Sequence, residues 1–141
     1  MAIKIKKILV PLDGSKNSFR GLDVAIHMAR QCQASVTGLY VLGITKPRPN
    51  DPISPLEKIL LENARKIMKK SKLIAAKRGI LFFEKVSYGD DEKRIVEIAE
   101  KNNFDLIVIG SRGMGAAKEI FLGSTSSYVL HKSKKPVLIV K

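Results

Sequence analysis

The feature that most constrains the fold is a short apolar run, Leu106-Ile-Val-Ile109, which lies between Asp105 and a glycine. A run of this length with polar residues beside it is typical of a strand that is buried on both faces. Such strands occur where helices cover both sides of a parallel sheet. Gly110 and Gly113 follow the run, and Gly123 stands ahead of a Ser- and Thr-rich helix start. The sequence therefore predicts a strand, a glycine turn, a loop and a helix N-terminus whose free N–H groups could bind an anion.

Other segments have the apolar and β-branched composition of strands, namely residues 3–12, 35–42, 80–87 and 136–140. Segments with helical spacing of apolar residues separate them, at about 16–31, from Pro55 to Gly79, after Gly89, and at about 124–132. Strands that alternate with helices predict βαβ units and a mostly parallel sheet with helices on both faces. The predicted fold class is therefore α/β, in a single domain that spans residues 1–141.

Two adjacent carboxylates, Asp90 and Asp91, open the helix that follows Gly89. A pair of carboxylates can serve acid–base chemistry. Acidic residues in a first turn also stabilise the positive end of the helix dipole. The second explanation is simpler, so we predict a helix-capping role for the pair.

The composition is that of a globular chain large enough to bury a core, because 45% of its 141 residues are hydrophobic and 28% are charged. No apolar run approaches the roughly 20 residues that a membrane-spanning helix needs, and the N-terminus lacks the pattern of a signal peptide. We therefore expect a cytoplasmic protein without a membrane partner. Cys32 is the single cysteine, so an internal disulfide is excluded, and one Cys with two His cannot build a Cys/His zinc cluster.

Basic residues outnumber acidic ones, 26 against 13, which gives a net charge of +13. Such a charge attracts polyanions, including nucleic acid and free nucleotides. The basic residues are spread along the chain, however, and their short clusters at 69–70, 77–78 and 132–135 fall at predicted helix ends, where cations complement the dipole. A solvated basic surface is the favoured interpretation, and nucleic-acid binding is the alternative.

The glycine spacing carries a family resemblance. Gly110-x-x-Gly113, nine further residues and then Gly123-Ser124 resemble the nucleotide-binding signature of the ATP-binding branch of the universal stress proteins. The resemblance covers the whole chain, because residues 8–15 and the last predicted strand also resemble the corresponding parts of that family. It implies a doubly wound, five-stranded sheet in the order 3-2-1-4-5, with the ligand bound where the strand order reverses.

The resemblance also implies which residues bind the nucleotide, namely Pro11, Asp13, Val41, Gly110, Arg112, Gly113, Gly123, Ser124 and Thr125. Asp13 would reach the ribose or adenosine side, or a metal held by the phosphates. Val41 would offer backbone groups to the edge of adenine. Gly110 would lie against the ribose, and Arg112 could add positive charge.

The phosphates would be held by backbone N–H groups and hydroxyls of Gly113, Gly123, Ser124 and Thr125, as the resemblance implies. Gly123 is expected to need either a positive φ or close contact with a phosphate oxygen. A side chain at this position would therefore interfere with the ligand or with the turn.

The predicted function is binding of ATP, with Mg²⁺ held by its phosphates, in a stress-response or signalling domain that hydrolyses ATP slowly at most. No Gly-x-x-x-x-Gly-Lys-Ser/Thr motif is present, which excludes a P-loop protein. No Gly-x-Gly-x-x-Gly follows the first predicted strand, as the usual dinucleotide binding would require. We recognise no catalytic acid, base or nucleophile and no metal ligand set. The alternative is a non-enzymatic basic module that binds a polyanion or a partner protein without nucleotide.

The last predicted strand contains Val137, Leu138, Ile139 and Val140 and would leave an exposed apolar edge in a monomer. In the universal stress protein family this strand often pairs with its copy in a partner, so the resemblance implies a homodimer. The apolar residues of segment 114–122 are expected to pack back onto the fold or against a second subunit.

Overall fold

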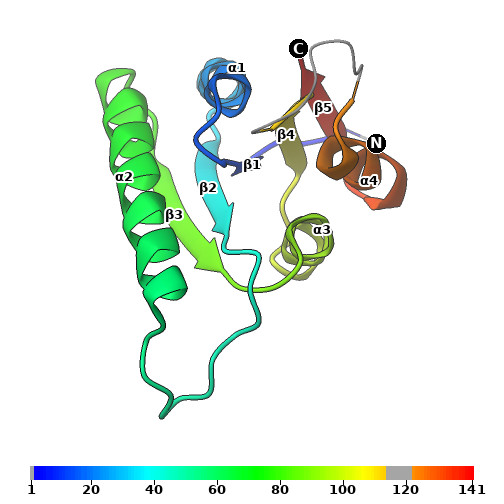
Figure 1. Ribbon diagram of the computed structural model, residues 1–141. Helices are drawn as coiled ribbons and strands as arrows, with labels where there is room; N and C mark the ends of the chain where they lie inside the picture. Colours follow the sequence, from blue (N-terminus) through cyan, green and yellow to red (C-terminus); the bar gives the residue numbers. More distant parts are fainter. Residues whose placement is uncertain (1, 114–121) are drawn as a thin grey trace.

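The computed structural model describes residues 2–113 and 122–141, and it shows one sheet with helices on both faces (Figure 1). The strands are β1 (Lys7–Pro11), β2 (Ser35–Val41), β3 (Phe82–Ser87), β4 (Leu106–Gly110) and β5 (Val137–Val140). The helices are α1 (Lys16–Cys32), α2 (Pro55–Lys77), α3 (Asp91–Lys101) and α4 (Ser124–Lys132). The strand order is β3-β2-β1-β4-β5 and neighbouring strands are parallel, which confirms the predicted doubly wound α/β fold.

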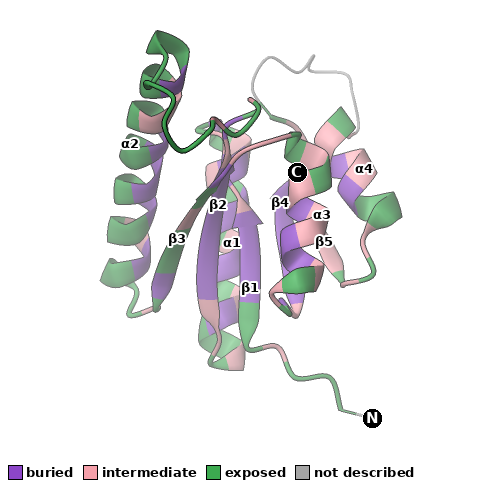
Figure 2. Ribbon diagram, turned by 90° about the horizontal axis from the view of Figure 1, so that it is seen from below, coloured by how far each residue is buried: buried purple, intermediate pink, exposed green. Residues whose placement is uncertain are grey.

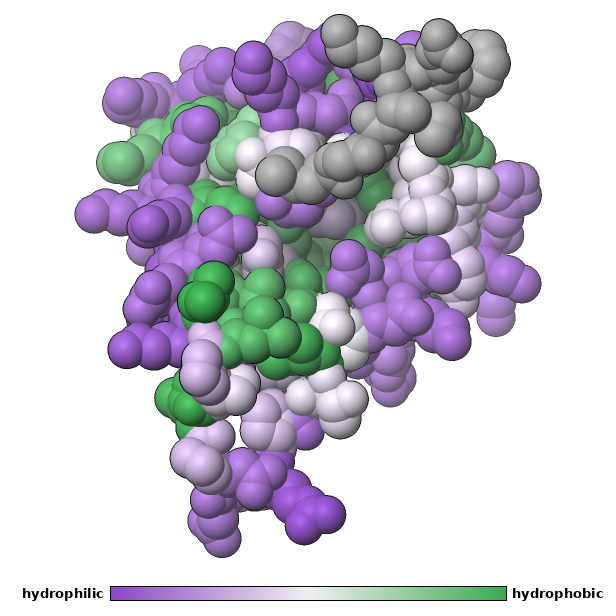
Figure 3. Space-filling model, viewed as in Figure 1, coloured by the Kyte–Doolittle hydropathy of each residue, from purple (hydrophilic) through white to green (hydrophobic). Residues whose placement is uncertain are grey.

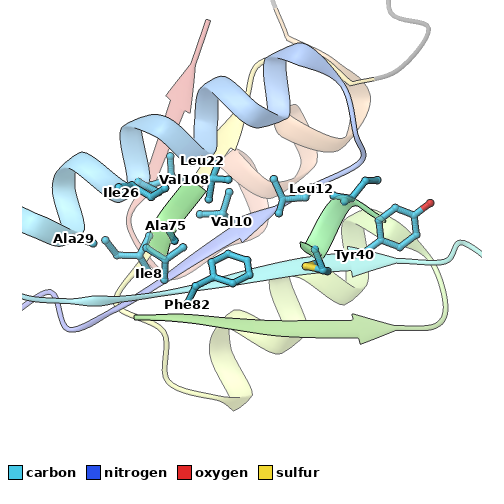
Figure 4. Close-up of a cluster of buried hydrophobic side chains, with 14 of the residues drawn as sticks. Ile8, Val10, Leu12, Leu22, Ile26, Ala29, Tyr40, Ala75, Phe82 and Val108 are labelled. Atoms are coloured by element: carbon cyan, nitrogen blue, oxygen red, sulfur yellow. The ribbon is translucent and has the colours of Figure 1, made fainter. Parts of the chain in front are cut away.

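Side chains alternate along the strands between two cores, because successive residues of a strand point to opposite faces. On β1, Ile8 and Val10 are buried against α1 and α2, while Leu9 is buried against α3 and α4. Figure 4 shows part of the first core, where Leu22 and Ile26 of α1 meet the strand residues. Helices on both faces explain why the strands read as continuous apolar runs.

Two of the helices, α1 and α2, begin at serines that cap them. The hydroxyl of Ser15 accepts a hydrogen bond from the N–H of Ser18 at 3.1 Å and caps α1. Ser54 caps α2 in the same way, through the N–H of Glu57 at 3.1 Å. Gly79 follows the C-terminus of α2 with a φ of 71°, a conformation that favours glycine. Among the described residues, no helix is both long enough and apolar enough to cross a membrane.

The first and third strands are shorter than predicted. The first begins at Lys7 rather than Ile3, and Ile3 is 80% exposed. β-branched residues favour a strand only where a neighbouring strand pairs with them, and the pairing of β2 with β1 starts at Lys7. The third strand begins at Phe82 rather than residue 80. Apart from Leu122, the segment 114–122, whose packing we predict above, lies outside the described residues.

The strands run in one direction, so their carboxyl ends lie along one edge of the sheet, towards the top of Figure 2. From β1 the chain continues to β2 on one side, and from β4 it continues to β5 on the other. The strand order therefore reverses between β1 and β4. In open parallel sheets, ligands bind at such a reversal.

Candidate functional site

A pocket of about 690 Å³ lies at this reversal, at the carboxyl ends of β1, β2 and β4. The N-terminal ends of α3 and α4 contribute to its walls. In Figure 3, which shows this face of the molecule, apolar side chains border a hollow near the centre. The structure brings every residue of the predicted site to this pocket, whose lining includes Pro11, Asp13, Val41, Gly110, Arg112, Gly113, Gly123, Ser124 and Thr125.

Asp13 holds the turn after β1 and faces the glycine turn after β4. Its Oδ1 accepts a hydrogen bond from the N–H of Ser15 at 2.9 Å. Its Oδ2 lies so close to Gly113 that a Cβ at that glycine would be only 2.5 Å away. The two turns therefore share one pocket, with a carboxylate between them.

Val41 directs its backbone groups into the space beyond the end of β1. The N–H of Leu12 donates to the carbonyl of Leu39 at 2.8 Å, on the β1 side of β2. The N–H of Leu42 donates to the carbonyl of Ser87 at 2.8 Å, on the β3 side. Backbone groups alternate between sides along a parallel strand, so the N–H and C=O of Val41 point towards β1. Since β1 has ended by this level, these groups open towards the pocket.

The N-terminus of α4 is fixed to the turn that follows β4. The carbonyl of Ser111 accepts hydrogen bonds from the N–H of Gly123 and the hydroxyl of Ser126, each at 2.7 Å. Ser124 and Thr125 lie in the first turn of α4 and line the pocket. The positive end of this helix dipole, with the N–H groups of the first turn, therefore borders the pocket.

Gly123 has a φ of −73°, which any residue adopts, so the expected alternative of a positive φ is wrong. A Cβ at this position would lie 3.5 Å from the carbonyl oxygen of Ser111, which is an ordinary contact. Within the described chain, Gly123 is thus required neither by its backbone conformation nor by its neighbours. Close contact with a phosphate stays a prediction.

Gly110 has a different physical reason to lack a side chain. A Cβ there would lie 2.5 Å from Oδ1 of Asn17 and 2.8 Å from the backbone oxygen of the same residue. One turn further along α1, a Cβ at Gly21 would lie 3.4 Å from the backbone nitrogen of Gly110. The close packing of α1 on β4 therefore explains Gly110, and its contact with a ribose stays a prediction.

The comparisons with known proteins agree with this geometry. The profile of the universal stress protein family matches residues 4–141. The chain belongs to the universal stress protein family. The universal stress protein MJ0531 of Methanocaldococcus jannaschii is 34% identical to it over 140 residues, which cover 96% of this chain and 82% of that relative.

Solved structures of other universal stress proteins share the whole fold. The protein UspA from Lactobacillus plantarum superposes with a TM-score of 0.85 at 26% identity, and the match covers 98% of this chain and 99% of that one. A universal stress protein solved in complex with cAMP superposes with a TM-score of 0.77 at 25% identity, over 96% of this chain and 97% of that one. The expected family and its strand order are therefore confirmed.

Asp91 is a pocket residue that the sequence analysis assigned to helix capping alone. It is the first residue of α3, and the preceding Asp90 makes no side-chain capping bond. Burial raises the pKa of the Asp91 carboxyl above its ordinary value, and the charges of Asp90, Asp13 and Glu92 raise it further. The position of Asp91 after the carboxyl end of β3 was the available signal, because that end of a parallel sheet faces its ligands.

Two further polar side chains line the pocket, although no sequence motif predicted a role for them there. Asn63 on α2 donates a hydrogen bond from Nδ2 to the hydroxyl of Tyr40 on β2 at 3.1 Å, and both residues line the pocket. In the described part of the chain, no group of three or more His, Cys, Asp or Glu residues is placed to hold a metal ion. A metal at this pocket would thus depend on ligands from a bound anion, with Asp13 and Asp91 as the nearby carboxylates.

Proposed function

We propose that this universal stress protein binds ATP, or a closely related adenine nucleotide, in the pocket between β1 and β4. It acts as a stress-response or signalling domain of the cytoplasm and hydrolyses ATP slowly at most. One observation carries the proposal: a helix N-terminus and the outward backbone groups of Val41 border the same pocket. The first suits an anion, and the second suits the edge of a base.

The end of the pocket at β2 fits adenine. Adenine presents an acceptor at N1 beside a donor at its amino group, so a peptide N–H and C=O that point the same way can pair with both. Val41 offers such a pair, and the buried side chains of Leu39 and Ile109 provide apolar surface for the ring. Apolar walls with a few oriented polar groups are typical of small-molecule sites.

The end of the pocket at α4 fits the phosphates. Gly123 leaves open the volume that a Cβ would fill, so a phosphate oxygen could approach the backbone there. Ser124 and Thr125 add hydroxyl groups to the N–H groups of the first helical turn. Asp13 lies beside Gly113, in the turn after β4, and would contact a Mg²⁺ ion carried by the phosphates.

The related protein solved with cAMP supports the ligand class, because cAMP combines adenine, ribose and a phosphate. In this chain, the glycine turn after β4 and the α4 N-terminus both line the pocket and offer two backbone segments to phosphates. That arrangement favours a nucleotide with more than one phosphate.

The experiment that tests the proposal measures ATP binding and its dependence on Gly123. Calorimetry with Mg-ATP should give a saturable heat, and ATP at about 100 times its dissociation constant should stabilise the fold by about 2.7 kcal/mol. Gly123→Ala should cost at most about 1 kcal/mol of stability without ligand, because the added methyl makes ordinary contacts and alanine is only a poorer N-cap than glycine. It should raise the dissociation constant for ATP by at least about tenfold, because the methyl enters the space for a phosphate.

Gly110→Ala is a contrasting variant rather than a control for binding, since its methyl would meet the backbone of α1. It should lower the free energy of unfolding by roughly 1–3 kcal/mol, as overpacking does. If millimolar Mg-ATP gives neither heat nor a change in Tm, the nucleotide proposal is wrong. If ATP binds but Gly123→Ala binds it equally well, the phosphates lie elsewhere.

A second candidate function rests on the outer surface of α2. This helix carries a set of exposed basic side chains, namely Lys58, Arg65, Lys66, Lys69, Lys70, Lys72 and Lys77. Glu62 is its one exposed acidic residue. Such a surface could bind a polyanion without nucleotide. Nucleic-acid binding that falls steeply with salt and does not change with ATP would favour this function over the first.

A further inference from the structure

Asn17 lies behind the pocket, in the first turn of α1, and joins the turn after β4 to the end of β5. Its Oδ1 accepts a hydrogen bond from the N–H of Arg112 at 2.7 Å, and the hydroxyl of Ser111 lies 3.5 Å from the same oxygen. Its Nδ2 donates to the carbonyl of Val140 at 3.3 Å. One half-buried side chain thus contacts segments that are 95 and 123 residues away in the sequence.

These contacts continue to the helix that borders the pocket. The carbonyl of Val140 also accepts a hydrogen bond from the N–H of Ser111 at 2.7 Å. The carbonyl of Ser111 in turn accepts from the N–H of Gly123, just before α4. A short series of hydrogen bonds therefore runs from Asn17 to the N-terminus of α4. Because each bond fixes the orientation of the next peptide, the turn and the helix keep one relative position.

Asn17 is not needed to start its own helix. Ser15 already caps α1 through the N–H of Ser18. Asn also has a lower helix propensity than most residues. The hydrogen bond to the backbone of Arg112 therefore explains the amide side chain, whereas the stability of α1 does not. Gly110 permits this arrangement, because a side chain there would strike Asn17.

We propose that Asn17 is a positioning residue for the phosphate end of the pocket, an inference that rests on the proposed nucleotide binding. Asn17 is absent from the pocket lining, so it acts through the turn from Gly110 to Gly113 rather than by touching the ligand. It holds that turn where Gly113 and the α4 N-terminus can face the same phosphates. The adenine end, at Val41, is formed by β2 and does not depend on this side chain.

The proposal therefore predicts different effects on the affinity for a ligand with phosphates and on the affinity for a ligand without them. Loss of the Asn17 amide should weaken binding of a ligand with phosphates and spare a ligand without them. A residue that only stabilises the fold would change both affinities together. Asn17→Ala and Asn17→Leu both remove the hydrogen bonds, the first with loss of volume and the second with the same branched shape but bulkier methyl groups.

The test measures ATP binding by calorimetry and adenosine binding by NMR titration, which detects millimolar affinities. Both variants should raise the dissociation constant for ATP by about three- to tenfold, the range expected for a lost hydrogen bond. The dissociation constant for adenosine should change less than about twofold. Asn102→Ala, at the C-terminal end of α3, is the matched control and should change neither.

Equal loss of both affinities, or no loss of either, would overturn the role of Asn17. That outcome is distinct from failure of the proposed function, in which the unmodified protein itself would not bind ATP. Agreement between the Ala and Leu variants assigns the effect to the lost hydrogen bonds, whereas an effect of Leu alone would assign it to crowding and also overturn the proposal.

Discussion

At the scale of single residues, the carboxylate of Asp91 needs a physical account, because it lines a pocket whose proposed ligand is an anion. Asp91 lies at the β2 end, where its Oδ1 would be 3.5 Å from a Cβ placed at Gly43. The N-terminus of α4, which suits phosphates, belongs to the connection between β4 and β5, whereas Asp91 follows β3 at the other end of the strand order. We therefore expect the negative charge of Asp91 nearer the base than the phosphates.

The raised pKa of Asp91 predicts the sign of a pH effect on stability. A carboxyl whose pKa is higher in the folded state stabilises the fold when protonated, and this contribution is lost as the pH rises through the folded pKa. Asp91→Asn should therefore raise the Tm at pH 7. The corresponding gain in the free energy of unfolding should be less than about 1 kcal/mol, because Asp91 is exposed to solvent. The difference should disappear as the pH falls below 3.8, the ordinary pKa of the group.

Thermal unfolding of the two proteins across this pH range is the measurement. Glu62→Gln, on the outer surface of α2, removes the same charge far from the pocket and serves as the control. A gain from Asp91→Asn that is no larger than that of the control at any pH would contradict the assignment of the effect to the pocket.

At the scale of elements, the N-terminus of α2 offers the clearest separation of stability from binding. Ser54 caps this helix of 23 residues and lies outside the pocket lining. Ser54→Ala should lower the free energy of unfolding by about 1 kcal/mol and the Tm by roughly 2–4 °C. The affinity for ATP should stay the same, because α2 reaches the pocket through Asn63, more than two turns away.

Denaturant unfolding combined with calorimetry checks this prediction. Ser127→Ala removes a hydroxyl from the interior of α4, where alanine is the better helix former, so it should be neutral or slightly stabilising. Equal losses from the two variants would mean that Ser54 stabilises the fold by something other than capping.

The elements themselves could be predicted from the sequence because their signals are local. Apolar runs, capping serines and Gly79 gave the order of strands and helices, and the family resemblance gave the strand order. The strand that starts at Lys7 could not be delimited, because Ile3 has the right residue type and lacks only a pairing partner. Asn17 could not be assigned for a similar reason, because its partner Val140 comes close only in the fold. Asp91 follows the carboxyl end of β3, which was an available signal, but its burial and the nearby charge of Asp13 arise only in the fold.

At the scale of the whole molecule, β5 is the last strand on one side of the sheet, and no described strand pairs with its outer side. Pro136 and Val140 turn their carbonyls to β4, where they accept from Ile107 at 2.9 Å and Ser111 at 2.7 Å. Backbone direction alternates along a strand, so Ile139 turns its N–H and C=O to this outer side. We propose that this side pairs with β5 of a second copy and forms the predicted homodimer.

Ile139→Pro should convert the dimer to a monomer, because proline removes the outward N–H and leaves the hydrogen bonds to β4 in place. Ile139→Ala loses the same packing but keeps the N–H, and it should remain a dimer. Light scattering and sedimentation of both variants give the oligomeric state. A monomeric unmodified protein at high concentration would contradict the proposed pairing.

The carbonyl of Val140, which holds both Asn17 and the turn after β4, has a practical consequence for anyone who handles this protein. An affinity tag or fusion partner joined directly after Lys141 would begin one residue beyond this carbonyl. The other end of the chain enters the sheet at Lys7, at the edge opposite the pocket (Figure 2). A tag is therefore better placed on the N-terminal side of Lys7. With a tag after Lys141, a binding assay would report the strain that the tag places on the turn after β4 as well as the affinity of the pocket.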